Sequence, residues 1–344
     1  MLFMIVSGIL TGSALGFVLQ RGRFCLTGGF RDMYIAKDNR LFYALLIAVF
    51  IQSIGIYTMQ QLNFIEFAVV GPFNWLGIII GSIAFGIGII WAGGCATGVW
   101  YRAGEGLISA WIALFAYMVM TITMRNGILA PITQEILSYQ VGSNSISDTF
   151  GIPTLVLIGI LGIITLFFVV KELKKPKLNI PTLKKKRSGL SYILLEKRWH
   201  PFVTAILIGL ISTAAWPLSA ATGRIFGLGI TQPSANLLMY VMSGNIDLLN
   251  WGVFLVLGIF IGSLIAAKLS NEFRFRAVDA KTSINAFGGG AMMGFGASLA
   301  AGCTIGNGLV QTALFSWQGW ISLFFIMVGV WIASYFVFKR KSTI

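Results

Sequence analysis

Charged residues are scarce in this chain. Of its 344 residues, 10% are Asp, Glu, Lys or Arg, whereas 57% are hydrophobic. A soluble globular domain usually carries about a quarter charged residues, so this composition excludes that class. Charge-free runs recur along the whole chain, and many reach the roughly 20 residues that are needed to cross a bilayer. The sequence therefore predicts an integral membrane protein.

Side chains suited to chemistry are few as well. The chain has one histidine, 11 acidic residues and three cysteines. The odd number of cysteines, each in or beside an apolar run, argues against a disulfide framework. There is no Cys-x-x-Cys pair, the methionines do not gather near the cysteines, and His200 begins an apolar run as an interfacial residue. A nucleophilic cysteine also needs a neighbouring base. We therefore predict no enzyme, no metal site and no cofactor.

The basic charge is concentrated in one place. The net charge is +14, and ten of the 25 Lys and Arg residues lie between Lys171 and Arg198. A basic block beside a membrane span is typical of a cytoplasmic loop that faces anionic lipid. The partner that this charge indicates is the lipid bilayer, and not nucleic acid.

The apolar runs define the expected fold. Backbone groups in lipid must be paired within their own segment, and these runs have the length of helices. The sequence therefore predicts an all-α polytopic membrane protein of about nine transmembrane helices with short re-entrant helices. The runs cover residues 1–20, 41–65, 67–101, 106–124, 149–170, 201–223 and 248–267, and 282–338 is long enough for two spans.

The basic loops set the expected topology. Placing residues 21–40, Arg102, the Lys171 block, residues 268–281 and the C-terminal Lys and Arg residues in the cytoplasm gives one consistent path. The N-terminus is then periplasmic and the C-terminus cytoplasmic. Residues 1–170 form a first unit of about five spans, 171–199 a basic cytoplasmic linker, and 200–344 a second unit of about four spans.

The two units contain related segments. When Cys95 is aligned with Cys303, four glycines also coincide without a gap. In a second alignment, at a different offset, Gly22-Arg23 lies over Gly223-Arg224. Five spans separate the starts of the two copies, so the copies enter the membrane from opposite sides. This arrangement is an inverted repeat, which places a substrate near the membrane midplane between broken helices. We expect such breaks in 67–101, in 226–246, and around Cys25 and Cys303.

The three cysteines are the candidate functional residues. Cys95 and Cys303 form a related pair, and Cys25 has Phe226 at its repeat position, so the three thiols define an asymmetric path. Gly94 and Gly302 are expected to break the helices and to expose backbone N–H groups to a small anion. The alternative is that these glycines serve helix packing. Arg21, Arg23 and Arg224 are candidates for drawing the anion in, or else for binding lipid headgroups.

Three segments resemble those of a known family. The stretches "QRGRFCLTGGFRDMY", "WAGGCATGVWYRAGEG" and "AAGCTIGNG" are similar to the cysteine motifs of the YeeE/YedE sulfur-transport family, and most similar to its YeeE branch. The resemblance covers essentially the whole chain. It implies a bacterial inner-membrane protein that imports thiosulfate for cysteine synthesis, with Cys25, Cys95 and Cys303 along the path and a small TusA-like sulfur carrier as partner.

Alternatives to thiosulfate import stay open at this point. The hypothesis is that thiosulfate passes between the thiols by transient S–H···S contacts. The rivals are a transporter of a selenium compound or a soft metal, and a membrane sulfurtransferase that passes sulfane sulfur as a persulfide.

Overall fold

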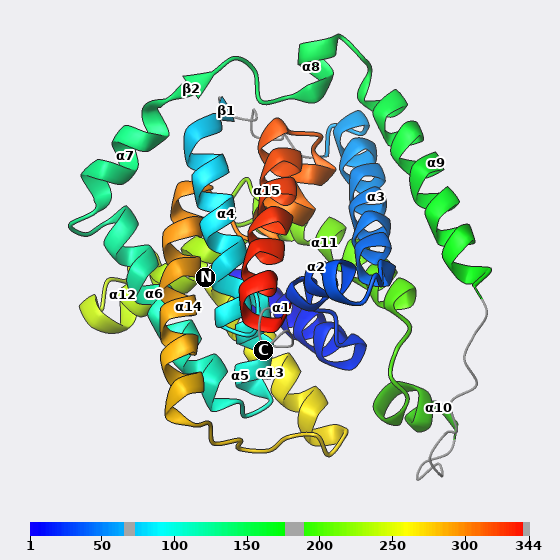
Figure 1. Ribbon diagram of the computed structural model, residues 1–344. Coiled ribbons are helices and arrows are strands. Elements are labelled where there is room, and N and C mark those ends of the chain that lie inside the picture. Colours follow the sequence, from blue (N-terminus) through cyan, green and yellow to red (C-terminus); the bar gives the residue numbers. More distant parts are fainter. Residues whose placement is uncertain (65–72, 176–188, 340–344) are drawn as a thin grey trace.

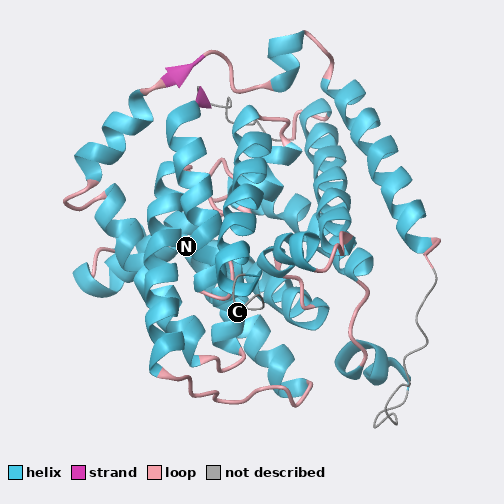
Figure 2. Cartoon of the chain, in the orientation of Figure 1, coloured by secondary structure: helices cyan, strands magenta, loops and turns pink. Residues whose placement is uncertain are grey.

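Helices make up nearly all of the protein. The computed structural model describes residues 1–64, 73–175 and 189–339, and its only strands there are the two-residue β1 (Phe73–Asn74) and β2 (Gln140–Val141) (Figures 1 and 2). Nine helices have 17 to 22 residues. They are α1 (Leu2–Gly22), α3 (Arg40–Gln61), α4 (Trp75–Trp91), α6 (Ile108–Arg125), α9 (Thr154–Leu173), α11 (Pro201–Ala220), α13 (Trp251–Leu269), α14 (Ala280–Leu299) and α15 (Trp317–Ser334).

Shorter helices follow the breaks that the sequence predicts. The long uncharged run at 67–101 forms α4 and then most of α5 (Ala96–Gly104). The first residues of this run, up to Pro72, lie outside the described part. The other short elements are α2 (Leu26–Ile35), α7 (Ala130–Ser138), α8 (Ile146–Phe150), α10 (Gly189–Ser191), η1 (Tyr192–Glu196), α12 (Thr231–Ser243), η2 (Ile246–Leu248), η3 (Gly306–Gln311) and η4 (Tyr335–Lys339). Residues 176–188 of the expected linker are also outside the described part.

The membrane class is confirmed. Among the described residues, eight helical stretches are long and apolar enough to cross a membrane. The ninth long helix, α14, is not among these eight, because glycine, alanine and polar residues replace much of its apolar bulk. The protein is an all-α polytopic membrane protein, and α14 as the ninth expected span stays a prediction.

The helices are arranged as two interlocked copies of one motif. Helices α1 to α6 correspond in order to α11, α12, α13, α14, η3 and α15, and equivalent pairs make equivalent contacts. Helix α1 packs on α13 as α11 packs on α3, α6 packs on α14 as α15 packs on α4, and α4 and α14 pack on each other. Helix α9 packs on α3 at the edge of the bundle (Figure 1). Because α9 is an odd fifth span, the second copy is inverted. The split into units at 170 and 200 stays a prediction.

Glycines at equivalent positions allow this close packing. A side chain at Gly86 on α4 would collide with the Ile326 carbonyl on α15, and one at Gly294 on α14 would collide with the Tyr117 carbonyl on α6. Dispersion contacts between closely approaching backbones stabilise helix pairs in lipid, where burial from water adds little. Gly86 and Gly294 therefore serve helix packing.

Candidate functional site

Each cysteine lies at the start of a short helical segment. Cys25 is the N-cap of α2 and Cys95 is the N-cap of α5, while Cys303 lies just before η3. A glycine follows each cysteine three residues later, and the backbone N–H of Gly98 donates to the Sγ of Cys95 at an N···Sγ distance of 3.4 Å. Unpaired N–H groups and the helix dipole make such a terminus favourable for an anion.

The three thiols form a series. A Cβ built on Gly98 would lie 3.4 Å from the Sγ of Cys95 and 3.7 Å from the Sγ of Cys25, so both thiols contact the same residue. The Cys25 and Cys95 thiols therefore lie near each other, and Thr304, which follows Cys303 in the chain, lies near Cys95. All three cysteines are free and buried, with 6%, 4% and 1% of the surface of Cys25, Cys95 and Cys303 exposed.

A pocket reaches Cys303 from one end of the bundle. Its volume is about 260 Å³, and Cys303, Gly306 and Thr231 line it together with Arg125 and Arg224. Arg125, at the end of α6, donates to Gln232 Oε1 at 2.5 Å. Two guanidinium groups and the start of a helical segment thus surround a thiol, and this combination fits a small anion.

Arg224 is also held firmly in place. Its Nη1 donates to the carbonyls of Phe226 and Gly227 at 2.9 and 2.8 Å and to Ser219 Oγ at 3.0 Å, and the guanidinium lies over the rings of Phe226 and Trp251. Arg224 therefore shapes the loop before α12 and, at the same time, contributes positive charge to the pocket wall.

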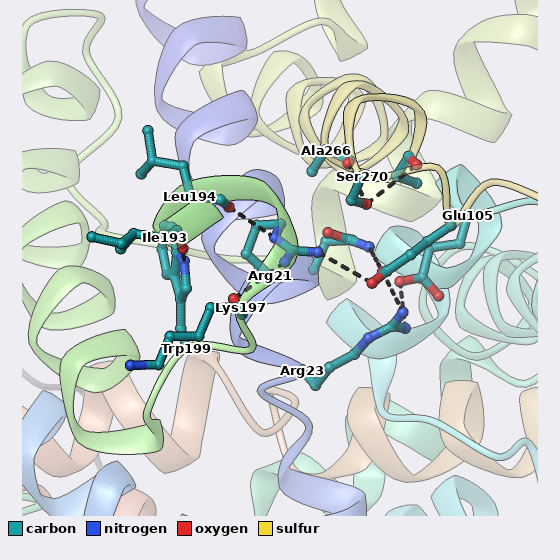
Figure 3. A network of polar contacts seen from close by, with 12 residues as sticks. Arg21, Arg23, Glu105, Ile193, Leu194, Lys197, Trp199, Ala266 and Ser270 are labelled. Carbon is teal, nitrogen blue, oxygen red and sulfur yellow. Dashed lines mark hydrogen bonds and ion pairs between the residues drawn. The ribbon is translucent and has the colours of Figure 1, made fainter. Parts of the chain in front are cut away.

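Arg21 and Arg23 lie at the opposite end of the bundle, in a network of ion pairs. Arg23 binds Glu105 at 2.7 Å and Glu272 at 2.6 Å, and Arg21 binds Glu272 at 3.3 Å (Figure 3). The Arg21 Nε and Nη2 also donate to the carbonyls of Leu194 and Lys197. Two carboxylates therefore neutralise these arginines, which tie the linker to the ends of α1, α5 and α13.

The backbone breaks fall one residue before the glycines that the sequence indicates. Gly93 and Ala301 have φ values of 71° and 53°, whereas Gly94 and Gly302 do not have positive φ. The left-handed conformation ends α4 and α14 and turns the chain back towards each cysteine. Gly302 serves packing instead, because a Cβ there would collide with Asn307.

The repeat counterpart of Cys25 is different from the one that the sequence alignment indicates. Cys25 is the N-cap of α2, and the N-cap of the equivalent α12 is Ile230, not Phe226. The loop before α12 is longer than the loop before α2, so a gapless alignment shifts the match. Thr231, the first residue of α12, brings a hydroxyl to this position.

Several residues of the site were not identified from the sequence. Arg125, Thr231, Thr304 and Tyr117 surround Cys303 and Cys95, and Arg102 lies near Cys25. The sequence did contain an indication for Arg125, because it is a lone basic residue at a span end that the predicted topology places outside. The hydroxyl residues had none, because threonine and tyrosine are ordinary residues in membrane helices.

Among the described residues, the thiols are not part of a metal site. In the described part of the chain no group of three His, Cys, Asp or Glu side chains lies close enough together to hold a metal ion. A second cavity, of about 800 Å³, lies between residues 193–207 and the region from Asp32 to Leu41, and no cysteine lines it. Cys303 thus lines the small pocket, and Cys25 and Cys95 lie together next to Gly98.

Comparison with known proteins shows the family to which the chain belongs. A model of a family described as sulphur transport matches residues 21–332. The chain is 58% identical to the "Thiosulfate transporter TsuA" of Escherichia coli K12 over 99% of this chain and 96% of that protein. It is 31% identical to a protein of the same name from Spirochaeta thermophila, over 98% of this chain and all of that protein. A "Probable transporter YedE" of Escherichia coli is 37% identical over 30% of this chain and 25% of its own length. This protein therefore belongs to the sulphur transport family of membrane proteins.

Proposed function

We propose that this protein imports thiosulfate across the bacterial inner membrane, along a path marked by Cys303, Cys95 and Cys25. The observation that carries the proposal is the unbroken series of neighbours from the Arg125 pocket to the Cys25 and Cys95 contact. The names of the two relatives that match over nearly the whole chain support the choice of thiosulfate.

The chemistry of each thiol suits this ion. Thiosulfate carries two negative charges, a soft terminal sulfur and three sulfonate oxygens. A thiol is a weak hydrogen-bond donor, so it can hold the terminal sulfur briefly and release it without a covalent bond. The N–H groups at the three helix starts offset the charge in a region that offers little water. Weak, repeated sites allow an ion to leave each site as readily as it binds.

The pocket beside Cys303 is the entrance in this proposal. Arg125 and Arg224 attract a dianion before it loses its hydration shell. The basic linker and the Arg21 network then lie on the cytoplasmic side, with the N-terminus in the periplasm. A small TusA-like carrier that receives the ion there, and its use in cysteine synthesis, complete the proposal on the basis of the sequence resemblance.

One structural feature favours a covalent rival. Because the Cys25 and Cys95 thiols both lie next to Gly98, sulfane sulfur bound to one as a persulfide is close to the other. The rival function is that of a membrane sulfurtransferase, in which the sulfonate part of thiosulfate does not cross. A selenium-compound transporter is tested by competition with excess selenite, and a soft-metal transporter by competition with Cu(I).

Uptake into proteoliposomes separates these functions. Purified protein is reconstituted and given thiosulfate labelled on both sulfur atoms, and Cys→Ser and Cys→Ala variants are compared at each site. Direct transport brings both labels inside in equal amounts, and Ser, which keeps a donor, retains partial activity. A persulfide relay brings in one label only and loses activity with every Cys→Ser change. Full uptake by a variant that lacks all three cysteines contradicts both mechanisms.

A further inference from the structure

One threonine lies beside each thiol of the path. Thr27 accompanies Cys25, Thr304 accompanies Cys95, and Thr231 accompanies Cys303. The pairs do not follow the order of the chain. Thr304 is next to Cys303 in the sequence but serves Cys95 in the other repeat, and Thr231 comes from the start of α12. Only the Thr304–Cys95 pair therefore joins the two repeats, since Thr27 and Cys25 lie in the first repeat and Thr231 and Cys303 lie in the second.

These three hydroxyl groups are buried without a hydrogen bond of normal geometry. Thr27, Thr231 and Thr304 expose 6%, 5% and 0% of their surface, and none of their Oγ1 atoms has such a partner. Other threonines in these helices bond back to a carbonyl four residues earlier, as Thr121 does to Tyr117 at 2.7 Å and Thr312 to Gly308 at 2.9 Å. Leaving a buried hydroxyl unpaired is unfavourable, and a group of them requires an explanation.

We infer that each thiol and its threonine form one two-point site for thiosulfate. The thiol contacts the terminal sulfur, and the threonine hydroxyl donates to a sulfonate oxygen. The inference rests on the proposed function, and it adds the residues that recognise the oxygen-bearing half of the ion. With three such sites in series, the ion moves from one site to the next and finds at each a thiol for its terminal sulfur and a threonine hydroxyl for its sulfonate oxygens.

Two-point binding accounts for selectivity. Sulfate has the oxygens but no terminal sulfur for the thiol, and hydrosulfide has the sulfur but no oxygens for the hydroxyl. Only an ion with both ends satisfies both groups, and a buried donor left without its acceptor weakens binding of the wrong ion.

Thr→Val substitution tests the inference, because valine keeps the shape of threonine and removes the hydroxyl. In proteoliposomes, T231V, T304V and T27V are each expected to lower thiosulfate uptake by about tenfold to a hundredfold, as expected for loss of a hydrogen bond to a charged group. The matching Thr→Ser variants keep the hydroxyl and are expected to retain most of the uptake.

Two further measurements separate recognition from structure. The melting temperature of each Val variant is expected to stay at or above that of the wild type, since a buried unpaired hydroxyl is removed. The control is T165V: Thr165 is equally buried and also lacks a hydrogen-bond partner, but it lies on α9, outside both repeats. We expect unchanged uptake for this variant.

The outcomes are distinct. If the wild-type protein and all three Val variants take up thiosulfate equally well, the two-point sites are overturned and the proposed function stands. Failure of the Ser variants to restore uptake also overturns them. If the wild-type protein does not take up thiosulfate under conditions where it is folded, the proposed function fails and the inference fails with it.

Discussion

Cys25 and Cys95, from separate breaks in the first repeat, place their thiols against the same residue, Gly98. The space at Gly98 is free of steric conflict, because a methyl group there would meet both sulfur atoms at ordinary contact distances of 3.4 and 3.7 Å. Glycine at this position is therefore not needed for packing, and in the proposed function it leaves room for the ion beside the two thiols.

The first prediction follows from this space. Gly98→Ala is expected to fold with unchanged or higher stability, since alanine favours a helix by about 1 kcal/mol over glycine, and to reduce thiosulfate uptake severely. Uptake and thermal unfolding in detergent measure the two effects. Gly159 on α9, whose Cβ position is also open, provides the matched control, and Gly159→Ala is expected to transport normally. Normal uptake by Gly98→Ala would show that the path runs elsewhere.

The second prediction concerns two glycines at equivalent repeat positions. A side chain at Gly302 collides with Asn307, which bonds to the Ala300 carbonyl at 2.8 Å and to Ser322 Oγ at 3.0 Å. Gly302→Ala is therefore expected to cost about 1–3 kcal/mol of stability through overpacking. Gly94→Ala meets only contacts of 3.4 Å or more and is expected to keep its stability. Equal melting temperatures for the two variants would contradict this difference.

The third prediction concerns the pocket. Arg125→Gln is expected to raise the KM for thiosulfate by about tenfold at low salt, because a change of about 1.4 kcal/mol in binding is tenfold in affinity. Because salt screens charges, the difference in KM between Arg125→Gln and the wild type is expected to become smaller at high ionic strength. Arg31→Gln, which removes an exposed cation paired with Asp32, is the control. An unchanged KM at both salt concentrations would rule out Arg125 as part of the entrance.

The fourth prediction tests the ion-pair network. Glu272 bridges Arg21 and Arg23, and the Arg21 side chain is 2% exposed. Glu272→Gln removes the opposite charge from this buried guanidinium and is expected to cost about 1–3 kcal/mol of stability. Asp32→Asn breaks the Arg31 pair, whose side chains are 40% and 37% exposed, and is expected to cost less than about 1 kcal/mol. Thermal unfolding measures the loss of stability in both variants. Equal losses would mean that burial of an ion pair does not increase its contribution to stability in this protein.

The fifth prediction tests the orientation. Ser243 at the end of α12 and Asn271 after α13 are exposed and lie at opposite ends of α13. A membrane-impermeant maleimide is expected to label Ser243→Cys in intact cells, and to label Asn271→Cys only after the cells are permeabilised. The native cysteines are buried and are expected to react little. The reverse pattern would place the N-terminus in the cytoplasm.

The fold class follows from the sequence because it depends on local properties. Charge-free runs of helix length specify spans wherever they pack, and an odd number of spans between two copies inverts the second copy. The breaks near Cys25, Cys95 and Cys303 were also predictable, because glycines beside a polar residue interrupt an apolar run. The counterpart of Cys25 was not, since the loop before α12 differs in length from the loop before α2.

The roles of the arginines depended on the tertiary structure. From the sequence, Arg21, Arg23 and Arg224 were equivalent candidates for binding an anion. In the folded protein, Glu105 and Glu272 neutralise the first two, whereas Arg224 reaches the pocket together with Arg125. The charge that an ion meets is decided by partners from distant parts of the chain, and these partners are brought together only by packing.

By itself, then, the sequence determined the membrane class, the spans, the repeat and the three thiols, because each is written in composition or spacing. The tertiary structure decided which groups surround each thiol. Thr231 lies beside Cys303 because folding of the second repeat brings the start of α12 to the same pocket, and Thr304 lies beside Cys95 because the two repeats interlock. Contacts between the two repeats depend on the packing of α4, α6, α14 and α15. They cannot be predicted from residue spacing along the chain.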